Sequence, residues 1–512
     1  MGREAPITRR TSRKYTNRMN RREFTKSFAW ALPGLAAPAI LSLPAQTISR
    51  PTRQKPHEFY VSSSAGNDRN DGRSPQTAWQ SLTRVNTADF QPGDKVLFRR
   101  NDLWRGSLRP KSGAEGWPIT YGAYGDGAKP ILQGSVAKDM PASWMSAGRN
   151  LWTTSPAPAP NPVLRMSPRS SSEEIGSEGT IDVDVGNIVF DHGCECGTKK
   201  WQREDLHQNG DFWYDPNSHQ VWLYSDAPPH TKHRSIELAL RRHIIDETGC
   251  QFVNYEDLHL RYGAAHGIGG GDTGHITVRQ CDVCFIGGGQ QFTDRQVRFG
   301  NGIEFWNTGK DNRVEQCRLW EIYDAALTNQ GLGPISEQVN IVYRNNVIWN
   351  AEYSFEYWNR PETARTQDIV FENNTCVDSG LGWGHRQRPD PNGHHLMFWQ
   401  NSAATTGVVV RNNIFSNATE SCLRMDNDWR RGLALDRNLW FQNHQIPVFS
   451  FMGQQFRTDQ LDAYRAISGF DSHSVVADPC FRDSDLHDYR LRPDSPALHW
   501  SAGGESCGAS IR

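Results

Sequence analysis

The segment Ile341-Val-Tyr-Arg-Asn-Asn346 is followed by a near copy, Ile369-Val-Phe-Glu-Asn-Asn374. Four more copies occur, at Ile276-Thr-Val-Arg-Gln-Cys281, Val314-Glu-Gln-Cys317, Val408-Val-Val-Arg-Asn-Asn413 and Leu433-Ala-Leu-Asp-Arg-Asn438. They lie about 25–39 residues apart, a period that indicates stacked solenoid units. Each alternates apolar and polar residues and ends in a small polar residue, as a short strand before a bend does. The sequence therefore predicts an all-β solenoid.

Four of these copies end in an asparagine, at Asn346, Asn374, Asn413 and Asn438. If the copies stack, the four side chains form an internal ladder at one corner of the solenoid. Each amide then hydrogen-bonds to the neighbouring turns and satisfies main-chain groups at the bend. We therefore expect these asparagines to have a structural role and not to bind a ligand.

The repeats resemble those of the bacterial right-handed parallel β-helix, or pectate-lyase-like, superfamily. Motifs near both ends share the resemblance: Phe59-Tyr-Val-Ser62, Gly66-Asn-Asp68, Pro92-Gly-Asp94, Pro118-Ile-Thr-Tyr-Gly-Ala-Tyr-Gly125, Asp478-Pro-Cys-Phe481, Tyr489-Arg-Leu-Arg-Pro493 and Ser495-Pro-Ala497. The resemblance covers roughly residues 51–512 and implies a right-handed parallel β-helix with an N-terminal cap or insertion and a C-terminal cap. It also implies a carbohydrate substrate, although a shared fold does not select the reaction.

An elongated solenoid accommodates the 512 residues without separate compact cores. We expect a leader at 1–50, an N-terminal cap with the first coils and an insertion at 51–235, the helix core with the active face at 236–450, and C-terminal coils with a cap at 451–512. Within the insertion, Phe212-Trp-Tyr-Asp215 and Val221-Trp-Leu-Tyr224 predict a β-hairpin. Ser167–Glu178 is rich in Ser and Glu and predicts a loop.

The N-terminal segment predicts export. Asn20-Arg-Arg-Glu-Phe-Thr-Lys26 resembles a twin-arginine signal, and an apolar stretch from Phe28 to Leu43 follows it. Cleavage is expected near Ala37-Pro-Ala39 or Pro44-Ala45. The stretch is too short and too broken by proline to span a membrane. We therefore expect a periplasmic or extracellular protein without a membrane span after processing.

Charge and cysteine content restrict the function further. Residues 1–50 contain ten Lys/Arg and two Asp/Glu, so the chain's 56 basic and 57 acidic residues leave 46 and 55 in the remainder. This acidic balance argues against binding nucleic acid, which requires a basic surface. Cys194-Glu195-Cys196 lacks the paired CxxC spacing of a zinc site. We expect most of the ten cysteines to be small buried residues.

A second strand recurs in each coil, with apolar residues at Ile268, Ile303, Leu327, Phe355, Leu396 and Leu423. If these point inward, period-two alternation directs the following residues outward. One outer column then reads Gly269, Glu304, Thr328, Glu356, Met397 and Arg424. The column two residues further on reads Gly271, Trp306, Gln330, Trp358, Trp399 and Asp426.

The first column places carboxylates where hydrolysis needs them. Glu304 and Glu356 flank Thr328 two coils apart, so their backbones should lie about 9.6 Å from each other. Asp324, at the bend before Leu327, offers a third carboxylate on the intervening coil. Paired carboxylates on either side of a glycosidic bond supply acid and base catalysis. We therefore predict that two of Glu304, Asp324 and Glu356 are catalytic.

The second column and the loops beside it supply candidate substrate-binding residues. Indoles at Trp306, Trp358 and Trp399 offer faces on which sugar rings stack. Polar candidates on the strands are Gln330, Arg424 and Asp426, and Arg360 follows the Glu356 strand. A long insertion before the Met397 strand adds His385, Arg386, Arg388, Asp390 and His394. Arginines there can neutralise an acidic substrate, and a histidine can act as acid or base.

Three functions remain open on this sequence. The leading one is a glycoside hydrolase that acts on a polysaccharide or oligosaccharide, without a cofactor and as a monomer. The second is a polysaccharide lyase, in which His385 and Arg386 act on a uronate and Ca²⁺ can assist. The third is a non-catalytic carbohydrate-binding β-helix.

If the N-terminal motif is a twin-arginine signal, changing both Arg21 and Arg22 to lysine should leave an unprocessed precursor in the cytoplasm. Immunoblots of fractionated cells measure this directly. Changing Arg9 and Arg10 to lysine, an arginine pair outside the motif, serves as the control and should not impair export. Continued export of the Arg21/Arg22 variant would contradict the assignment.

Overall fold

The computed structural model describes residues 55–154, 181–292, 295–333, 335–360, 362–399, 403–498, 500 and 506–510. The twin-arginine motif, the apolar stretch after it and the loop at Ser167–Glu178 lie outside the described residues. The described residues belong to the unit that begins at Lys55. None of its helices in the described ranges has the length and apolar character that crossing a membrane requires.

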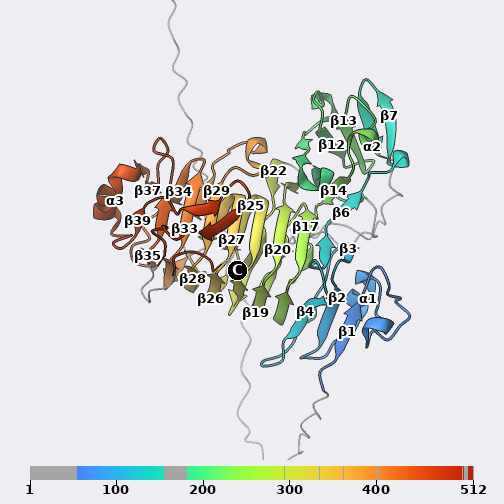
Figure 1. Ribbon diagram of the computed structural model, residues 1–512, viewed down its shortest axis with the longest axis horizontal. Coiled ribbons are helices and arrows are strands. Elements are labelled where there is room, and N and C mark those ends of the chain that lie inside the picture. The colour runs from blue at the N-terminus through green and yellow to red at the C-terminus, as the bar shows by residue number, and fades with distance from the viewer. Residues whose placement is uncertain are drawn as a thin grey trace, which may run out of the picture. The chain divides into compact units, whose positions relative to one another are not determined.

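Three ladders of parallel strands stack coil upon coil along the chain (Figure 1). The first contains β1 (Glu58–Val61), β2 (Lys95–Arg99), β4 (Ile119–Tyr124), β16 (Gln251–Glu256), β19 (Gly271–Arg279), β24 (Arg313–Glu315), β26 (Glu337–Arg344), β28 (Arg365–Glu372), β32 (Val408–Arg411) and β35 (Leu433–Asp436). The second contains β3 (Leu103–Arg105), β5 (Ile131–Gln133), β17 (His259–Gly263), β20 (Asp282–Ile286), the first half of β25 (Arg318–Gly331), the first half of β27 (Val347–Asn359), β29 (Thr375–Ser379), β33 (Ile414–Ala418), β36 (Leu439–Phe441) and β39 (Val475–Val476).

The third ladder carries the candidate site. It contains β15 (Ile245–Asp246), β18 (Ile268–Gly269), β23 (Ile303–Lys310), the second halves of β25 and β27, β30 (His394–Phe398), β34 (Ser421–Met425) and β37 (Phe449–Phe451). Because successive coils add strands to these ladders in parallel register, the predicted right-handed parallel β-helix is confirmed.

The asparagine ladder forms as the repeats predict. Asn346, Asn374, Asn413 and Asn438 are all fully buried. The main-chain N–H of Asn346 donates to Oδ1 of Asn374 over 2.9 Å, and the N–H of Asn374 donates to Oδ1 of Asn413 over 2.8 Å. Nδ2 of Asn374 donates back to the carbonyl of Tyr343 over 3.1 Å. Each amide therefore joins its own coil to both neighbours.

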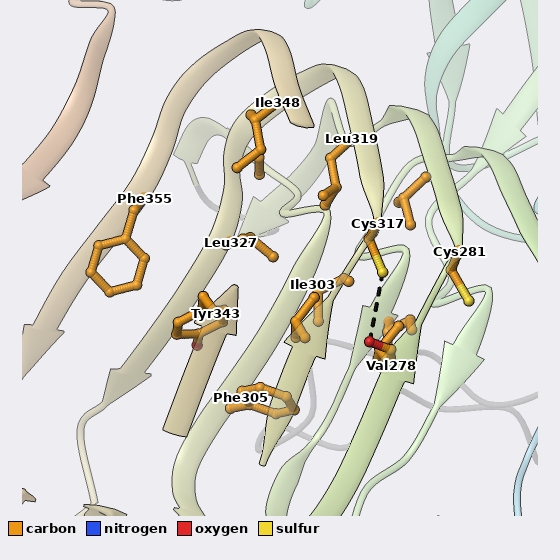
Figure 2. Close-up of a cluster of buried hydrophobic side chains, with 14 of the residues drawn as sticks. Val278, Cys281, Ile303, Phe305, Cys317, Leu319, Leu327, Tyr343, Ile348 and Phe355 are labelled. Carbon is orange, nitrogen blue, oxygen red and sulfur yellow. Dashed lines mark hydrogen bonds between the residues drawn. The ribbon is translucent and has the colours of Figure 1, made fainter. Parts of the chain in front are cut away.

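The residue before each ladder position explains the doubled asparagines. Asn345, Asn373 and Asn412 have φ angles of 56°, 54° and 57°, in the left-handed region. Asparagine tolerates this region better than most residues, so it turns the chain at the corner at little cost. Toward the N-terminus, Cys317 takes the ladder position, and its Sγ donates to the carbonyl of Val278 over 3.6 Å (Figure 2).

The core fills the inside of the coils with apolar side chains. Figure 2 shows Ile303, Leu327 and Phe355 pointing inward together with side chains of the other two ladders. All ten cysteines carry free thiols, and seven of them are buried, in keeping with the expectation of small buried residues.

An N-terminal insertion separates the first coils from the later ones, and a cap lies at each end of the coils. In the insertion, β14 (Ile236–Leu240) pairs antiparallel with β6 (Ser135–Ala137) and β9 (Val185–Phe190), which also pairs with β10 (Glu195–Cys196). A separate sheet contains β7 (Trp144–Gly148), β8 (Leu151–Thr154), β11 (Thr198–Lys199), β12 (Asp211–Asp215) and β13 (Gln220–Tyr224). In this sheet β12 and β13 form the predicted hairpin.

Smaller elements complete the described chain. Helix α1 (Leu82–Thr87) lies in the N-terminal cap, α2 (Pro229–Lys232) in the insertion and α3 (Leu461–Ser468) near the C-terminal end of the coils. The remaining strands are β21 (Gly289–Phe292), β22 (Arg295–Phe299), β31 (Ala404–Thr406), β38 (Gln454–Phe456), β40 (Phe481–Asp483) and β41 (Asp488–Leu491).

Replacing Asn374 with leucine should destabilise the fold by about 1–3 kcal/mol, because it leaves buried main-chain groups without partners. Urea denaturation measures the free energy of unfolding. Gln91 is exposed, so Gln91→Leu is the control and should change that free energy by less than about 0.5 kcal/mol. A stable Asn374 variant that no longer binds carbohydrate would show instead that Asn374 is a ligand.

Candidate active site

The strand register on the third ladder is the one that the sequence predicts. Ile303 pairs with Leu327 and Leu327 with Phe355, so Glu304, Thr328 and Glu356 stand side by side on successive strands. Two residues further along the same strands, Trp306, Gln330 and Trp358 also stand side by side. Two strand spacings separate the backbones of Glu304 and Glu356, a distance of about 9.6 Å.

The column that contains Glu304 is covered, whereas the alternation pattern predicts an exposed one. Glu304 is 5% exposed and Glu356 is 6% exposed, and Thr328 and Met397 are fully buried. Met397 packs with Ala325, Tyr353 and Trp399 in a small apolar cluster outside the main core. The face is therefore lined by side chains and loops that partly dehydrate its carboxyl groups.

Glu304 is anchored through one carboxylate oxygen. Nδ2 of Asn301 donates to Oε2 of Glu304, and Nε2 of His266 lies 3.4 Å from the same oxygen. Nδ1 of His266 accepts the main-chain N–H of Asn301 over 2.8 Å, so in the neutral ring the proton is on Nε2 and faces Glu304. Burial raises the pKa of Glu304 to about 7, against the hydrogen bond from Asn301, and the charge on Asp324 adds to the rise.

Glu356 is held through both of its carboxylate oxygens. Nε1 of Trp399 donates to Oε1, and Nε2 of Gln330 donates to Oε2. Burial raises the pKa of Glu356 well above its ordinary value, and the negative charge on Asp324 adds to the shift. Trp399 and Gln330 thus position Glu356.

Asp324 lies between these glutamates and the long loop at residues 380–393. Nη1 of Arg388 donates to Oδ1 of Asp324 over 3.2 Å and to the carbonyl of Tyr323 over 2.9 Å. Burial raises the pKa of Asp324, and the positive charge of Arg388 opposes the shift, whereas Glu352 reinforces it. Asp324 is therefore the one of the three carboxyl groups that has a direct cationic partner.

Glu352 organises the loop over the site. Nδ1 of His385 lies 3.0 Å from Oε2 of Glu352, and Nε of Arg388 lies 3.5 Å from Oε1. The main-chain N–H of Asn392 donates to Oε1 over 2.7 Å. Two of the candidate residues on this loop, His385 and Arg388, thus both reach the carboxylate of Glu352.

The tryptophan column forms in register but does not make a flat stacking surface. The rings of Trp306 and Trp358 meet edge to face, with centroids 5.7 Å apart and planes at 80°. Trp399 is turned so that its N–H reaches Glu356. All three indoles are half-buried. Trp306 and Trp358 therefore stay candidates for stacking on sugar rings, whereas Trp399 also positions Glu356.

The remaining predicted residues are dispersed. Arg424 pairs with Asp426 over 3.1 Å and its guanidinium lies 5.5 Å from the Trp399 ring, while that of Arg360 lies 5.3 Å from the Trp358 ring. Arg386 and Asp390 are exposed on the loop. His394 is buried, its Nδ1 lies 3.0 Å from the carbonyl of Ser421, and burial lowers its pKa to about 3. This environment suits packing rather than proton transfer near neutral pH.

Sequence reasoning missed His266, Asn301 and Glu352. All three lie just before the inward apolar residue of their coil, where strict alternation fails because Ser354 and Phe355 are both buried. The recurrence of a polar residue two positions before Ile268 and Ile303 was the available signal. Within the described ranges, no group of three or more His, Cys, Asp or Glu side chains is arranged to hold a metal ion.

Comparison with known sequences gives a match over a short part of the chain. No protein-family model matches the chain. A lacto-N-biosidase of Bifidobacterium longum subsp. longum is 37% identical over 87 residues, which make up 16% of this chain. The matched stretch spans only 5% of the length of that curated relative.

Solved structures with similar folds include both hydrolases and lyases. A glycoside hydrolase aligns with a TM-score of 0.47 and 10% identity over 78% of this chain and 96% of its own. Pectate lyase Pel9A aligns with a TM-score of 0.46 and 11% identity over 90% and 98%. A GH136 lacto-N-biosidase from Eubacterium ramulus gives 0.37 and 12% over 82% and 67%. Because these TM-scores are below 0.5, the fold is assigned from the strand pairing of the chain itself.

Proposed function

We propose that the chain is a glycoside hydrolase in which Glu304 is the general acid and Asp324 is the partner carboxylate. The observation that carries this proposal is the cluster of Glu304, Asp324 and Glu356, three carboxyl groups that interact electrostatically on one face of the β-helix. Glycosidic bond cleavage requires one protonated and one ionised carboxyl group near the same bond.

Hydrogen-bond occupancy distinguishes the roles of the three carboxyl groups. Both oxygens of Glu356 accept side-chain hydrogen bonds. By contrast, no described residue donates a hydrogen bond to Oε1 of Glu304 or to Oδ2 of Asp324. These two oxygens are available to substrate, and Glu356 serves to bind and orient it.

The surroundings of Glu304 and Asp324 indicate which of the two carboxyl groups carries the proton. With a pKa of about 7, Glu304 carries a proton in a large fraction of molecules near neutrality and can transfer it to the glycosidic oxygen. Arg388 favours the ionised form of Asp324. The Asp324 carboxylate then either removes a proton from the attacking water or bonds to the anomeric carbon, according to its separation from Glu304.

The pairing of the cations favours hydrolysis over β-elimination. A lyase needs a cation to neutralise the uronate carboxylate beside the proton that is removed. Here Arg388 binds Asp324 and Glu352, Arg424 binds Asp426 and His385 binds Glu352, whereas Arg386 is exposed on the loop. These contacts leave a face rich in carboxyl groups, which suits a neutral sugar. The lyase, with Ca²⁺ assistance, and the non-catalytic binding protein remain the alternatives.

The cellular setting of this activity is part of the proposal. The twin-arginine motif supports export to the periplasm or the exterior, where polysaccharides and oligosaccharides are available as substrates. We also propose that the protein acts as a monomer, because the paired strands that carry the candidate site belong to one chain and the site requires no second copy.

Glu304→Gln and Asp324→Asn should each lower kcat by about 10²–10⁴-fold, because each removes one half of the acid and base pair. Glu304 must be protonated to act, so wild-type activity should fall as pH rises through about 7. A substrate with an acidic phenol as leaving group needs little protonation. It should therefore restore much of the activity of Glu304→Gln but not that of Asp324→Asn.

Steady-state kinetics across pH, with circular dichroism as a check on folding, provide the measurements. Glu115 is exposed in the N-terminal coils, so Glu115→Gln is the control and should retain wild-type kcat and pH dependence. Folded Glu304→Gln and Asp324→Asn proteins with full activity would contradict the assignment. Loss of activity on Arg386→Ala together with that result would favour the lyase.

A further inference from the structure

The loop over the site also makes contact in the opposite direction, toward the N-terminal insertion. His385 and Arg388 reach the carboxyl groups, but Gln387, which lies between them, faces away from those groups. Its Oε1 accepts the main-chain N–H of Lys199 over 3.2 Å and Nη1 of Arg298 over 2.9 Å. Its Nε2 donates to the carbonyl of Gly197 over 2.9 Å. One side chain thus joins the loop to two other segments.

Arg298, which is buried, makes hydrogen bonds to the loop, to the insertion and to the turn before β21. Its Nε donates to the carbonyl of Gly288 over 2.7 Å, and its Nη2 donates to the carbonyl of Gly186 over 2.8 Å. The guanidinium lies 4.6 Å from the centroid of the Tyr323 ring and 5.6 Å from that of Trp383. A buried guanidinium is stable only when its donors are used in this way. Tyr323 immediately precedes Asp324.

The main chains in this region approach too closely for side chains. A Cβ atom on Gly288, whose φ is +90°, would lie 2.7 Å from Nη2 of Arg298, from the carbonyl oxygen of Gly186 and from the ring of Trp383. A Cβ on Gly186 would lie 2.3 Å from the main-chain nitrogen of Gly289. The insertion, the turn before β21 and the loop therefore meet at a junction that glycine makes possible.

A buried ion pair fixes the insertion side of this junction. Nζ of Lys199 lies 2.5 Å and 2.7 Å from the two carboxylate oxygens of Asp184. Both side chains are almost fully buried, at 3% and 8% exposure. Oδ2 of Asp184 also accepts the main-chain N–H of Gln290 over 2.7 Å. The buried ion pair with Asp184 thus holds Lys199 in place, and with it the main-chain N–H that donates to Gln387.

We propose that Gln387 is a positioning residue that couples the N-terminal insertion to the active site by holding Arg388 against Asp324 and His385 against Glu352. The proposal rests on the proposed function, since it assigns Asp324 the role of the ionised carboxylate. It makes the insertion a structural part of the active site.

The coupling has a measurable electrostatic consequence. Charged and titratable groups that interact with Asp324 are Arg388, Glu352, Asp390, Glu304, Glu356, Tyr353 and Tyr323. Among these groups, Arg388 is the one cation within hydrogen-bond distance of Asp324, through a single contact of 3.2 Å between Nη1 and Oδ1. If the loop loosens and Arg388 withdraws, the ionised form of Asp324 loses its partner. The pKa of Asp324 then rises, and activity is lost at a higher pH on the acidic side of the profile.

Gln387→Ala and Gln387→Met test the proposal, since methionine keeps the length of the side chain but forms none of the three hydrogen bonds. Both variants should lower kcat by about 10- to 100-fold through misplacement of the catalytic groups. Both should also move the acidic limb of the pH profile of kcat/KM upward by about one pH unit. Leu381 is 60% exposed at the start of the same loop, so Leu381→Ala is the control and should match wild type.

Hydrogen–deuterium exchange of residues 381–393 supplies a reading that does not depend on activity. Exchange should be faster in both Gln387 variants and unchanged in Leu381→Ala. Folded Gln387 variants with wild-type exchange, or with faster exchange and an unmoved acidic limb, would overturn the proposal. A wild-type protein that cleaves no glycan would overturn the proposed hydrolase instead, and the exchange comparison would still decide whether Gln387 holds the loop.

Discussion

Hydrogen bonding between successive coils is the constraint on which the rest of the structure depends. Main-chain bonds fix each strand at about 4.8 Å from the next, and the buried amides of Asn346, Asn374, Asn413 and Asn438 repeat that contact at the corner. A slip of one residue would exchange the inner and outer faces of a strand. Because the corner residues forbid such a slip, any side chain placed on the outer face is placed in a row, at a spacing set by the backbone.

The candidate site uses this spacing to hold like charges together. Glu304, Asp324 and Glu356 would repel one another if all three were ionised, and their burial adds to the cost. Three neutral donors, Asn301, Gln330 and Trp399, and one cation, Arg388, divide the cluster into groups with different proton affinities. Different proton affinities within one cluster are what acid and base catalysis requires. The rigid coils make the arrangement possible, since a flexible backbone would relax away from it.

The sequence predicts the parts of this arrangement that repeat. Local period-two patterns aligned between coils predict the ladder asparagines, the inward row from Ile268 to Leu423 and the shared column of Glu304 and Glu356. Features of the site that occur in only one coil or in a loop could not be predicted from the repeats. The burial of Glu304 depends on loops, His266 and Glu352 lie at a bend where alternation fails, and the contact of Gln387 with Gly197 joins segments far apart in the chain. The edge-to-face contact of Trp306 and Trp358 could not be predicted either, because register fixes where these residues stand but not how their rings turn.

Product analysis after digestion of neutral and uronate-containing polysaccharides tests the central claim most directly. If buried carboxyl groups on the third ladder catalyse hydrolysis, the wild-type protein should release new reducing ends from a neutral glycan. These products should lack the ultraviolet absorbance of an unsaturated uronate. Release of unsaturated products from a uronate polymer, with neutral glycans left intact, would contradict the account.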